Sequence, residues 1–290
     1  MQVIRGRFGK HPGHRALHAK GVICAGTFTA TPAARELTRA PHMQGEPVPA
    51  IVRFSNGGGD PGVPDYAPDV RGLAVSFELP DGSRTDIVAQ TAPHFPFRTP
   101  DEFIEFIPLS RPSPATALRL PVYLARHPHV ARTLPANLKA LSPPASFAAR
   151  PYYAIHAFKW IAADGSERWM RYTWRPHDPQ PNLSRAEAKR RGRNYLFEEL
   201  AQRLERGPVR FDLEVQIAGP GDDPHDPAAT WPTDRERVVA GTLEVTSVAE
   251  GRDGMVFDPT RVCEGIELSD DPVLRFRPRA YSLSHEARSA

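Results

Sequence analysis

The sequence has little cysteine, little net charge and no long hydrophobic run. Its only cysteines, Cys24 and Cys263, are too few for a disulfide framework or a cysteine-rich zinc site, so we expect inert thiols. A net charge of +3 over 290 residues argues against a nucleic-acid partner. Because no signal peptide or membrane span is visible, we expect a cytoplasmic protein without a membrane partner, with a processed periplasmic form as the alternative.

Proline, in contrast, is abundant. The chain has 32 prolines, and because proline interrupts helices and fixes turns, this number argues against a helical bundle. It favours many short elements instead. The sequence shows no internal repeat and no low-complexity tract. We therefore expect a single domain over residues 1–290.

Eight short apolar segments bounded by turn residues predict β-strands. Two of the turns are Asp81-Gly82 and Asp164-Gly165, and Asp-Gly between apolar runs is a strong hairpin signal. The predicted strands are residues 15–31, 50–55, 72–79, 85–89, 155–161, 167–174, 210–217 and 238–246. Sequential antiparallel strands at this spacing favour an α+β fold built on a closed eight-stranded antiparallel β-barrel.

Two regions between these strands predict helices. The first is an insertion near residues 100–145. The second covers residues 184–206, where Ser184 is followed three residues later by Glu187, as in a capping box. Residues 219–234 are rich in glycine, proline and aspartate, which predicts a crossing loop rather than a domain linker.

The most informative motif lies in the last fourteen residues. Arg277 and Tyr281 are four positions apart, and His285 and Arg288 follow on nearly the same helix face. A nearby guanidinium favours the ionised form of a tyrosine, and a phenolate is a hard anionic ligand for ferric iron. Such a pair is more often a surface contact, so its meaning depends on whether the rest of the chain supplies an iron site.

Several further blocks supply the rest of such a site. They are Arg15-x-x-His18, Val52-Arg53-Phe54-Ser55, Asp69-Val70-Arg71-Gly72, the segment 93–103 and Val256-Phe257-Asp258-Pro259. Together with Arg277-x-x-x-Tyr281, these blocks resemble in order and spacing the haem-dependent monofunctional catalases, most closely their small catalase-related peroxidase branch. The resemblance covers roughly residues 7–288 and implies a catalase-like barrel with helical insertions and a pocket for haem b.

The resemblance implies a role for each proximal and haem-edge residue. Tyr281 matches the phenolate ligand of the iron, and Arg277 matches the arginine that keeps this phenolate ionised. Arg15, Arg53 and Arg288 match the arginines that bind the haem propionates, where a guanidinium fork holds each carboxylate.

It also implies the distal residues. His18 matches the catalytic histidine that moves a proton between the two peroxide oxygens, and Ser55 matches the hydroxyl that hydrogen-bonds its ring. Phe103 matches an aromatic ring packed on the haem face and Phe95 a ring of the distal pocket. Asp69 matches a carboxylate in the access channel.

One departure from the family pattern affects the catalytic residues. Catalases place an asparagine beside the distal histidine, whereas the alignment puts Gln90 here, or Thr91 if it slips by one residue. Glutamine carries the same amide on a longer stem. We therefore predict weakened dismutation of hydrogen peroxide.

A second departure concerns access to the site. A valine that narrows the channel in typical catalases aligns with Gly57, which predicts a wider entry and bulkier hydroperoxide substrates. The alternative is a flexible glycine-rich turn without a gating role.

Two further departures concern the end of the chain and its assembly. Pro278 follows Arg277 directly, so we expect the ligand helix to kink or to restart at Pro278. The N-terminal arm, wrapping loop and C-terminal helical domain of large catalases have no counterpart here. We therefore expect a monomer or small homo-oligomer and no NADPH site.

The resemblance leaves three functions open. The first is a haem peroxidase that uses a peroxide and an organic electron donor through a ferryl intermediate, with weak catalase activity. The second is a fatty-acid hydroperoxide isomerase like allene oxide synthase, but that family has threonine where this chain has Leu17. The third is a non-enzymatic haem sensor or store, and the retained His18 counts against it because a mere binder needs no distal acid–base group.

Overall fold

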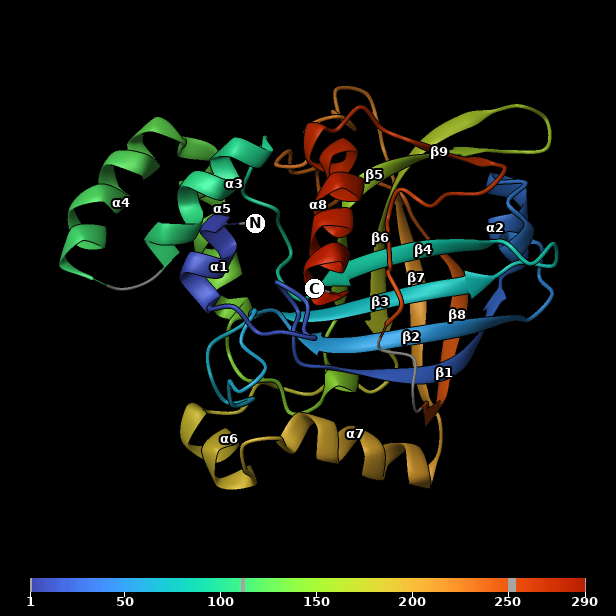
Figure 1. The fold of residues 1–290 in the computed structure, drawn as a ribbon. Coiled ribbons are helices and arrows are strands. Elements are labelled where there is room, and N and C mark those ends of the chain that lie inside the picture. The colour runs from blue at the N-terminus through green and yellow to red at the C-terminus, as the bar shows by residue number, and fades with distance from the viewer. Residues whose placement is uncertain (1, 111–112, 250–253, 290) are drawn as a thin grey trace.

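The computed structural model describes residues 2–110, 113–249 and 254–289, without the side chains of Gln2 and residues 283–289. Its centre is an antiparallel β-sheet rolled into a barrel (Figure 1). The eight barrel strands are β1 (Gly21–Ala30), β2 (Val48–Asn56), β3 (Arg71–Glu78), β4 (Arg84–Gln90), β5 (Tyr152–Ile161), β6 (Glu167–Pro176), β7 (Val209–Ile217) and β8 (Arg237–Val248).

Two long-range pairings close the barrel. β1 pairs with β8, and Gln90 at the end of β4 pairs with Tyr153 of β5. A short strand, β9 (Ile266–Leu268), adds to the other side of β5. The predicted closed eight-stranded antiparallel barrel is therefore confirmed.

The first strand differs from its prediction. It begins at Gly21, whereas residues 15–20 form a loop. His18 lies in this loop with φ of 54°, which is incompatible with an extended strand. Arg15 and His18 therefore precede the sheet instead of starting it.

The barrel interior is filled by large side chains. Phe28, Phe54, Trp160, Trp174 and Phe211 are all fully buried, and Phe28 meets Trp174 edge to face with 6.1 Å between ring centroids. Burial of one such side chain stabilises a fold by about 1.5–3 kcal/mol. Because the interior is a packed core, a ligand site must lie on the outer surface of the barrel.

Helices pack around the outside of the barrel (Figure 1). The predicted insertion contains α3 (Pro100–Phe106), α4 (Pro114–Arg126) and α5 (Pro128–Ala140), which gather near α1 (Gln2–Phe8) on one side of the barrel. The last helix, α8 (Pro272–Ser289), lies against the strands beside α3. The remaining short helices are α2 (Pro32–Leu37), η1 (Pro41–Met43), η2 (Ile107–Ser110) and η3 (Phe147–Ala149).

The predicted helix 184–206 is two helices, α6 (Arg185–Arg191) and α7 (Tyr195–Arg206). The prediction of one helix was wrong because Gly192, with φ of 112°, ends α6. The capping box is confirmed, since Ser184 Oγ accepts from the Glu187 amide and the Glu187 carboxylate accepts from the Ser184 amide. Both helices lie at one end of the barrel (Figure 1).

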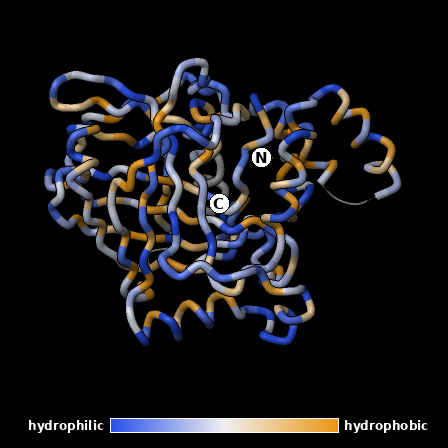
Figure 2. Tube along the Cα trace, turned by 180° about the vertical axis from the view of Figure 1, so that it is seen from behind, coloured by the Kyte–Doolittle hydropathy of each residue, from blue (hydrophilic) through white to orange (hydrophobic). Residues whose placement is uncertain are grey.

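Hydrophobic residues are distributed along the elements rather than concentrated in one run. Figure 2 shows them alternating with hydrophilic residues along the strands and along α7. In α7, Leu196, Leu200 and Leu204 recur every fourth residue and are buried. Among the described helices, none combines the length and the apolar character needed to cross a bilayer.

Candidate active site

A cavity of about 820 Å³ lies on the outer face of the sheet, a volume within the usual range for ligand sites. Strands β2, β3 and β4 form its floor, and residues of α1, α3 and α8 form its walls. The predicted site residues that line it are Arg15, His18, Arg53, Ser55, Asp69, Gln90, Phe95, Phe103, Arg277 and Tyr281. Arg288 lies outside the described side chains. The fold thus brings every described candidate residue to one cavity.

Strand alternation explains why polar side chains reach this cavity from a packed barrel. Successive side chains of a strand point to opposite faces, so Val52 and Phe54 of β2 enter the core while Arg53 and Ser55 line the cavity. The register places Ser55 opposite Gly72 of β3, and Gly72 opposite Gln90 of β4. Ser55 and Gln90 therefore flank Gly72 in one row across three strands.

Gly72 leaves the space that His18 and Ser55 use. A Cβ atom at this position would lie 2.6 Å from Ser55 Oγ and 2.7 Å from His18 Nδ1. Without it, the His18 ring approaches the sheet, and its Nδ1 lies 2.9 Å from Ser55 Oγ. The distal hydrogen bond predicted from the sequence is present, and it depends on a glycine that the prediction did not single out.

The backbone of His18 is held from both sides. Its amide donates to the Gly57 carbonyl at 3.0 Å, and its own carbonyl accepts from Arg53 Nη2 at 3.0 Å. Among the described residues, His18 is the one non-glycine with positive φ, a conformation that persists where surrounding contacts determine it. The loop therefore presents the imidazole to the cavity in a defined position.

The protonation of His18 follows from its surroundings. Burial, followed by the charges of Arg53, Arg277 and Arg15, lowers the pKa of His18 to about 3. The imidazole is therefore neutral near pH 7 and able to accept a proton.

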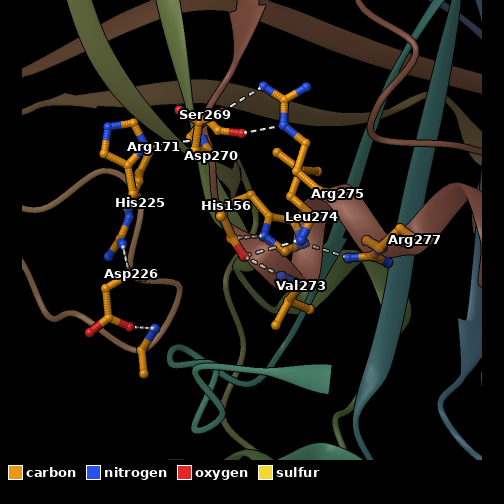
Figure 3. A network of polar contacts seen from close by, with 12 residues as sticks. His156, Arg171, His225, Asp226, Ser269, Asp270, Val273, Leu274, Arg275 and Arg277 are labelled. Carbon is orange, nitrogen blue, oxygen red and sulfur yellow. Dashed lines mark hydrogen bonds and ion pairs between the residues drawn. The ribbon is translucent and has the colours of Figure 1, made fainter. Parts of the chain in front are cut away.

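On the proximal side, α8 brings Arg277 and Tyr281 one helical turn apart, as predicted. Arg277 donates to Tyr281 Oη from Nε at 3.0 Å and from Nη2 at 2.6 Å. Its third nitrogen, Nη1, donates to His156 Nε2 at 2.9 Å (Figure 3). The planar guanidinium thus links the tyrosine to a strand of the barrel.

This link continues to a buried carboxylate. Because Arg277 donates to Nε2 of His156, the proton of a neutral His156 lies on Nδ1, which donates to Asp271 Oδ2 at 2.6 Å. Burial lowers the pKa of His156 despite the nearby carboxylate, in keeping with the neutral ring. Asp271 Oδ1 also caps α8, accepting from the amides of Val273 and Leu274 at 2.7 and 3.1 Å.

Neither His156 nor Asp271 was predicted from the sequence. Asp271 had a recognisable signal, since aspartate before Pro272 is typical of a helix start. His156 had no local signal, because it lies 115 residues from Asp271 and 121 from Arg277 in the chain.

Pro278 lies inside α8, which begins at Pro272. Of the two expected outcomes, the restart at Pro278 was therefore wrong, whereas the kink stays a prediction. The capping of α8 by Asp271 gives the physical reason, because it sets the helix start at Pro272, six residues before Pro278.

The two candidates for the distal amide position can be compared directly. Gln90 lines the cavity at the end of β4. Thr91 is buried, and its Oγ1 accepts from the Arg71 amide at 3.0 Å. Of the two, Gln90 is the residue with access to the cavity.

The space expected beside Gly57 contains another side chain. A Cβ atom on Gly57 would lie 2.4 Å from Val70 Cγ2 and 2.8 Å from Asp69 Oδ1. Asp69 is held by the Gly58 amide at 2.8 Å, and burial raises the pKa of its carboxyl. A wider entry at Gly57 remains a prediction and depends on Val70.

The residues of the cavity fit a haem group. Phe95 and Phe103 supply an apolar aromatic wall, and the guanidinium groups of Arg15 and Arg53 supply positive charge for carboxylates. Tyr281 supplies an oxygen ligand of the kind that ferric haem accepts. Gly21 contributes to this fit, because a Cβ atom there would lie 2.3 Å from Arg53 Nη2.

Comparisons with known proteins agree with this arrangement. The family model described as Catalase matches residues 10–290. A "Catalase-related peroxidase" of Mycolicibacterium paratuberculosis is 49% identical, with 100% of this chain and 93% of that protein covered. A protein of the same name from Synechococcus elongatus is 33% identical, with 100% and 87% covered.

A solved structure shares the fold. The protein described as "Structure of a bacterial catalase" matches with a TM-score of 0.82 and 27% identity, covering 95% of this chain and 57% of that one. Family and fold together imply a haem cofactor, as do the residues of the cavity. The chain belongs to the catalase family.

Proposed function

We propose that this protein is a haem b peroxidase that reduces hydrogen peroxide or organic hydroperoxides with an organic electron donor and has weak catalase activity. The main support is that the hydrogen-bonded His18–Ser55 pair and the hydrogen-bonded Arg277–Tyr281 pair line the same cavity. The two relatives named catalase-related peroxidase support the same reaction class. The ferryl route expected from the resemblance is part of this proposal.

Each residue has a distinct task in the proposed reaction. When bound, the haem iron supplies the cleavage of the peroxide O–O bond and stores its oxidising equivalents. His18 Nε2 accepts the proton of the incoming peroxide, while Ser55 holds the ring through Nδ1. Arg277 keeps Tyr281 Oη in position through two hydrogen bonds.

The lining of the cavity supports organic substrates as well as hydrogen peroxide. Phe95, Phe97 and Phe103 form an aromatic cluster at its wall, with 5.3 Å between the rings of Phe95 and Phe97. Such a wall favours alkyl or aryl hydroperoxides by hydrophobic contact. Gln90 offers an amide for a hydrogen bond to the peroxide.

The test compares the haem-loaded protein with a His18→Gln variant and with a His14→Gln control, which changes an exposed histidine four residues earlier in the chain. We expect dye oxidation to exceed oxygen evolution under hydrogen peroxide. His18→Gln should lower kcat/KM for peroxide by about 10²–10⁴-fold without loss of the haem spectrum. The control should match the wild type.

Other results would change the assignment. A haem-loaded protein with neither activity would favour a sensor or store. Conversion of a fatty-acid hydroperoxide into a rearranged epoxide, rather than an alcohol, would favour the isomerase.

A further inference from the structure

A second group of chemically active side chains lies behind the cavity wall, on α3 and at the junction of α4 and α5. Glu102 belongs to α3, while His127 lies between α4 and α5 and His129 in the first turn of α5. Their side chains are 16%, 18% and 14% exposed, so each keeps limited access to solvent. Phe103, the neighbour of Glu102, lines the cavity. This group, the Glu102–His127–His129 cluster, has no part in the proposed reaction.

The three side chains offer one ligand atom each within a small volume. Glu102 Oε2 lies 3.0 Å from His129 Nε2, and Glu102 Oε1 lies 3.4 Å from His127 Nδ1. All three ligand atoms lie within 4.8 Å of one another. Ligands at zinc–nitrogen and zinc–oxygen distances are about 3.3–3.6 Å apart in a tetrahedral site. Each imidazole therefore already lies near this spacing from one of the two carboxylate oxygens of Glu102, and side-chain rotation is the remaining adjustment needed to bring the three ligand atoms around one ion.

The surroundings orient these side chains toward one another. The Arg98 amide donates to Glu102 Oε2 at 2.8 Å, and Tyr123 donates to the Glu102 carbonyl at 3.1 Å. The Tyr123 ring also packs on His127, with 4.4 Å between centroids. These contacts hold the Glu102 carboxylate and the His127 ring in place.

A fourth residue stands at the far side of His127. His127 Nε2 lies 3.8 Å from Glu105 Oε2, while its Nδ1 faces Glu102. Histidines that bind metals commonly donate their second ring nitrogen to a carboxylate, which fixes the tautomer. The Glu105 carboxylate lies on the side of His127 where such a second partner belongs.

We propose that Glu102, His127 and His129 form a binding site for a divalent transition metal ion, with zinc as the best match. Two imidazoles and one carboxylate form a ligand set that zinc uses, with water completing the coordination. Calcium and magnesium prefer all-oxygen sites and fit this set less well. The bound ion ties the α4–α5 pair to α3, the helix that carries Phe103 on the cavity wall. The proposal is independent of the peroxidase assignment.

The test measures zinc binding by untagged, haem-loaded protein. The protein is dialysed to equilibrium against zinc chloride, and zinc and haem iron are then measured separately in the same sample. We expect about one zinc per chain, and a rise in the unfolding midpoint of about 5 °C in saturating zinc. Glu102→Gln and His129→Gln should each lose the zinc and the rise in midpoint, while circular dichroism and the haem spectrum stay unchanged.

Two further variants sharpen the test. Glu105→Gln should retain the site but weaken zinc affinity about tenfold. His177→Ala is the matched control, because His177 is paired with a carboxylate, Asp212 at 2.7 Å, but lies outside the Glu102–His127–His129 cluster. It should bind zinc like the wild type.

A wild type that takes up no zinc under these conditions would overturn the proposal, whatever the behaviour of the variants. Equal zinc uptake by the wild type and both ligand variants would also overturn it. In either case the three side chains form only a hydrogen-bonded cluster that joins the helices.

Discussion

The distal and proximal residues of the cavity are held in place by different kinds of contact. On the distal side, His18 comes from a loop with φ of 54°, and Ser55 and Gln90 come from separate strands. On the proximal side, Arg277 and Tyr281 share one helix and one turn. The distal geometry therefore depends on strand register and on space beside Gly72, whereas the proximal pair depends on helical spacing.

The proximal side combines a local contact with long-range ones. The proximal pair is local, but the direction of its guanidinium depends on His156 and Asp271, which reach it from outside that turn. Local spacing is therefore sufficient to bring Arg277 to Tyr281, and a long-range contact orients it. On the distal side, even the contact between His18 and Ser55 joins residues 37 positions apart in the chain. We expect a small change of volume to disturb the distal side most, and a change of hydrogen-bond polarity to disturb the proximal side.

The largest effect is expected from Gly72→Ala. The added methyl group would meet Ser55 Oγ and His18 Nδ1 at 2.6 and 2.7 Å, so the pair must separate. We expect kcat/KM for peroxide to fall about 10²-fold and stability to fall by about 1–3 kcal/mol. Steady-state kinetics and urea unfolding measure the two effects.

Gly6→Ala is the control for this substitution, because a Cβ atom added at Gly6 would meet none of the surrounding described residues within 4 Å. It should leave kcat/KM nearly unchanged and should not lower stability, because alanine is favoured over glycine inside a helix such as α1. Full activity in Gly72→Ala would show that the distal pair does not depend on this space.

A smaller effect is expected from Asp271→Asn. Asparagine still caps α8, but its amide nitrogen can oppose the Nδ1–H of His156 and favour the other tautomer. His156 Nε2 then carries a proton toward Arg277, and the fork on Tyr281 weakens. We expect about a tenfold loss of activity with a shift of the visible haem spectrum.

Asp270→Asn is the matched control, since Asp270 is the adjacent residue and its side chain is 82% exposed. It should leave the haem spectrum unchanged. If Asp271→Asn lowers stability without moving the spectrum, Asp271 serves only the helix cap.

A change of a few-fold is expected at Gln90. Gln90→Asn shortens the stem by one carbon and restores the amide that catalases use, so oxygen evolution should rise about threefold relative to dye oxidation. Thr91→Ser keeps the hydroxyl that accepts from the Arg71 amide and should change neither rate. The ratio of the two rates is the measurement, and an equal change in both variants would contradict the role of Gln90.

The smallest effect is expected from mild acid. Because the pKa of His18 is lowered to about 3, its neutral, proton-accepting form persists as the pH falls from 7 to 5. Peroxide kcat/KM should therefore change less than about twofold over this range. The haem spectrum recorded at each pH checks that the protein stays folded. An acid limb with an apparent pKa near 6.5 would show that His18 titrates as an ordinary histidine.

Local sequence signals were sufficient for much of the fold. Short apolar segments and the Asp-Gly turns predicted eight strands, and Ser184 with Glu187 predicted the capping box. The i, i+4 spacing predicted the contact of Arg277 with Tyr281. These features depend on interactions among residues close in the chain, so the order of residue types determines them.

The tertiary structure decided the remainder. The position of His156 against Arg277, the row of Ser55, Gly72 and Gln90, and the Glu102–His127–His129 cluster all join segments from different elements. Their contacts follow from barrel closure, strand register and helix packing, which no short stretch of sequence encodes. The sequence by itself determined which residue types reach the cavity, and folding in three dimensions determined which atoms meet there.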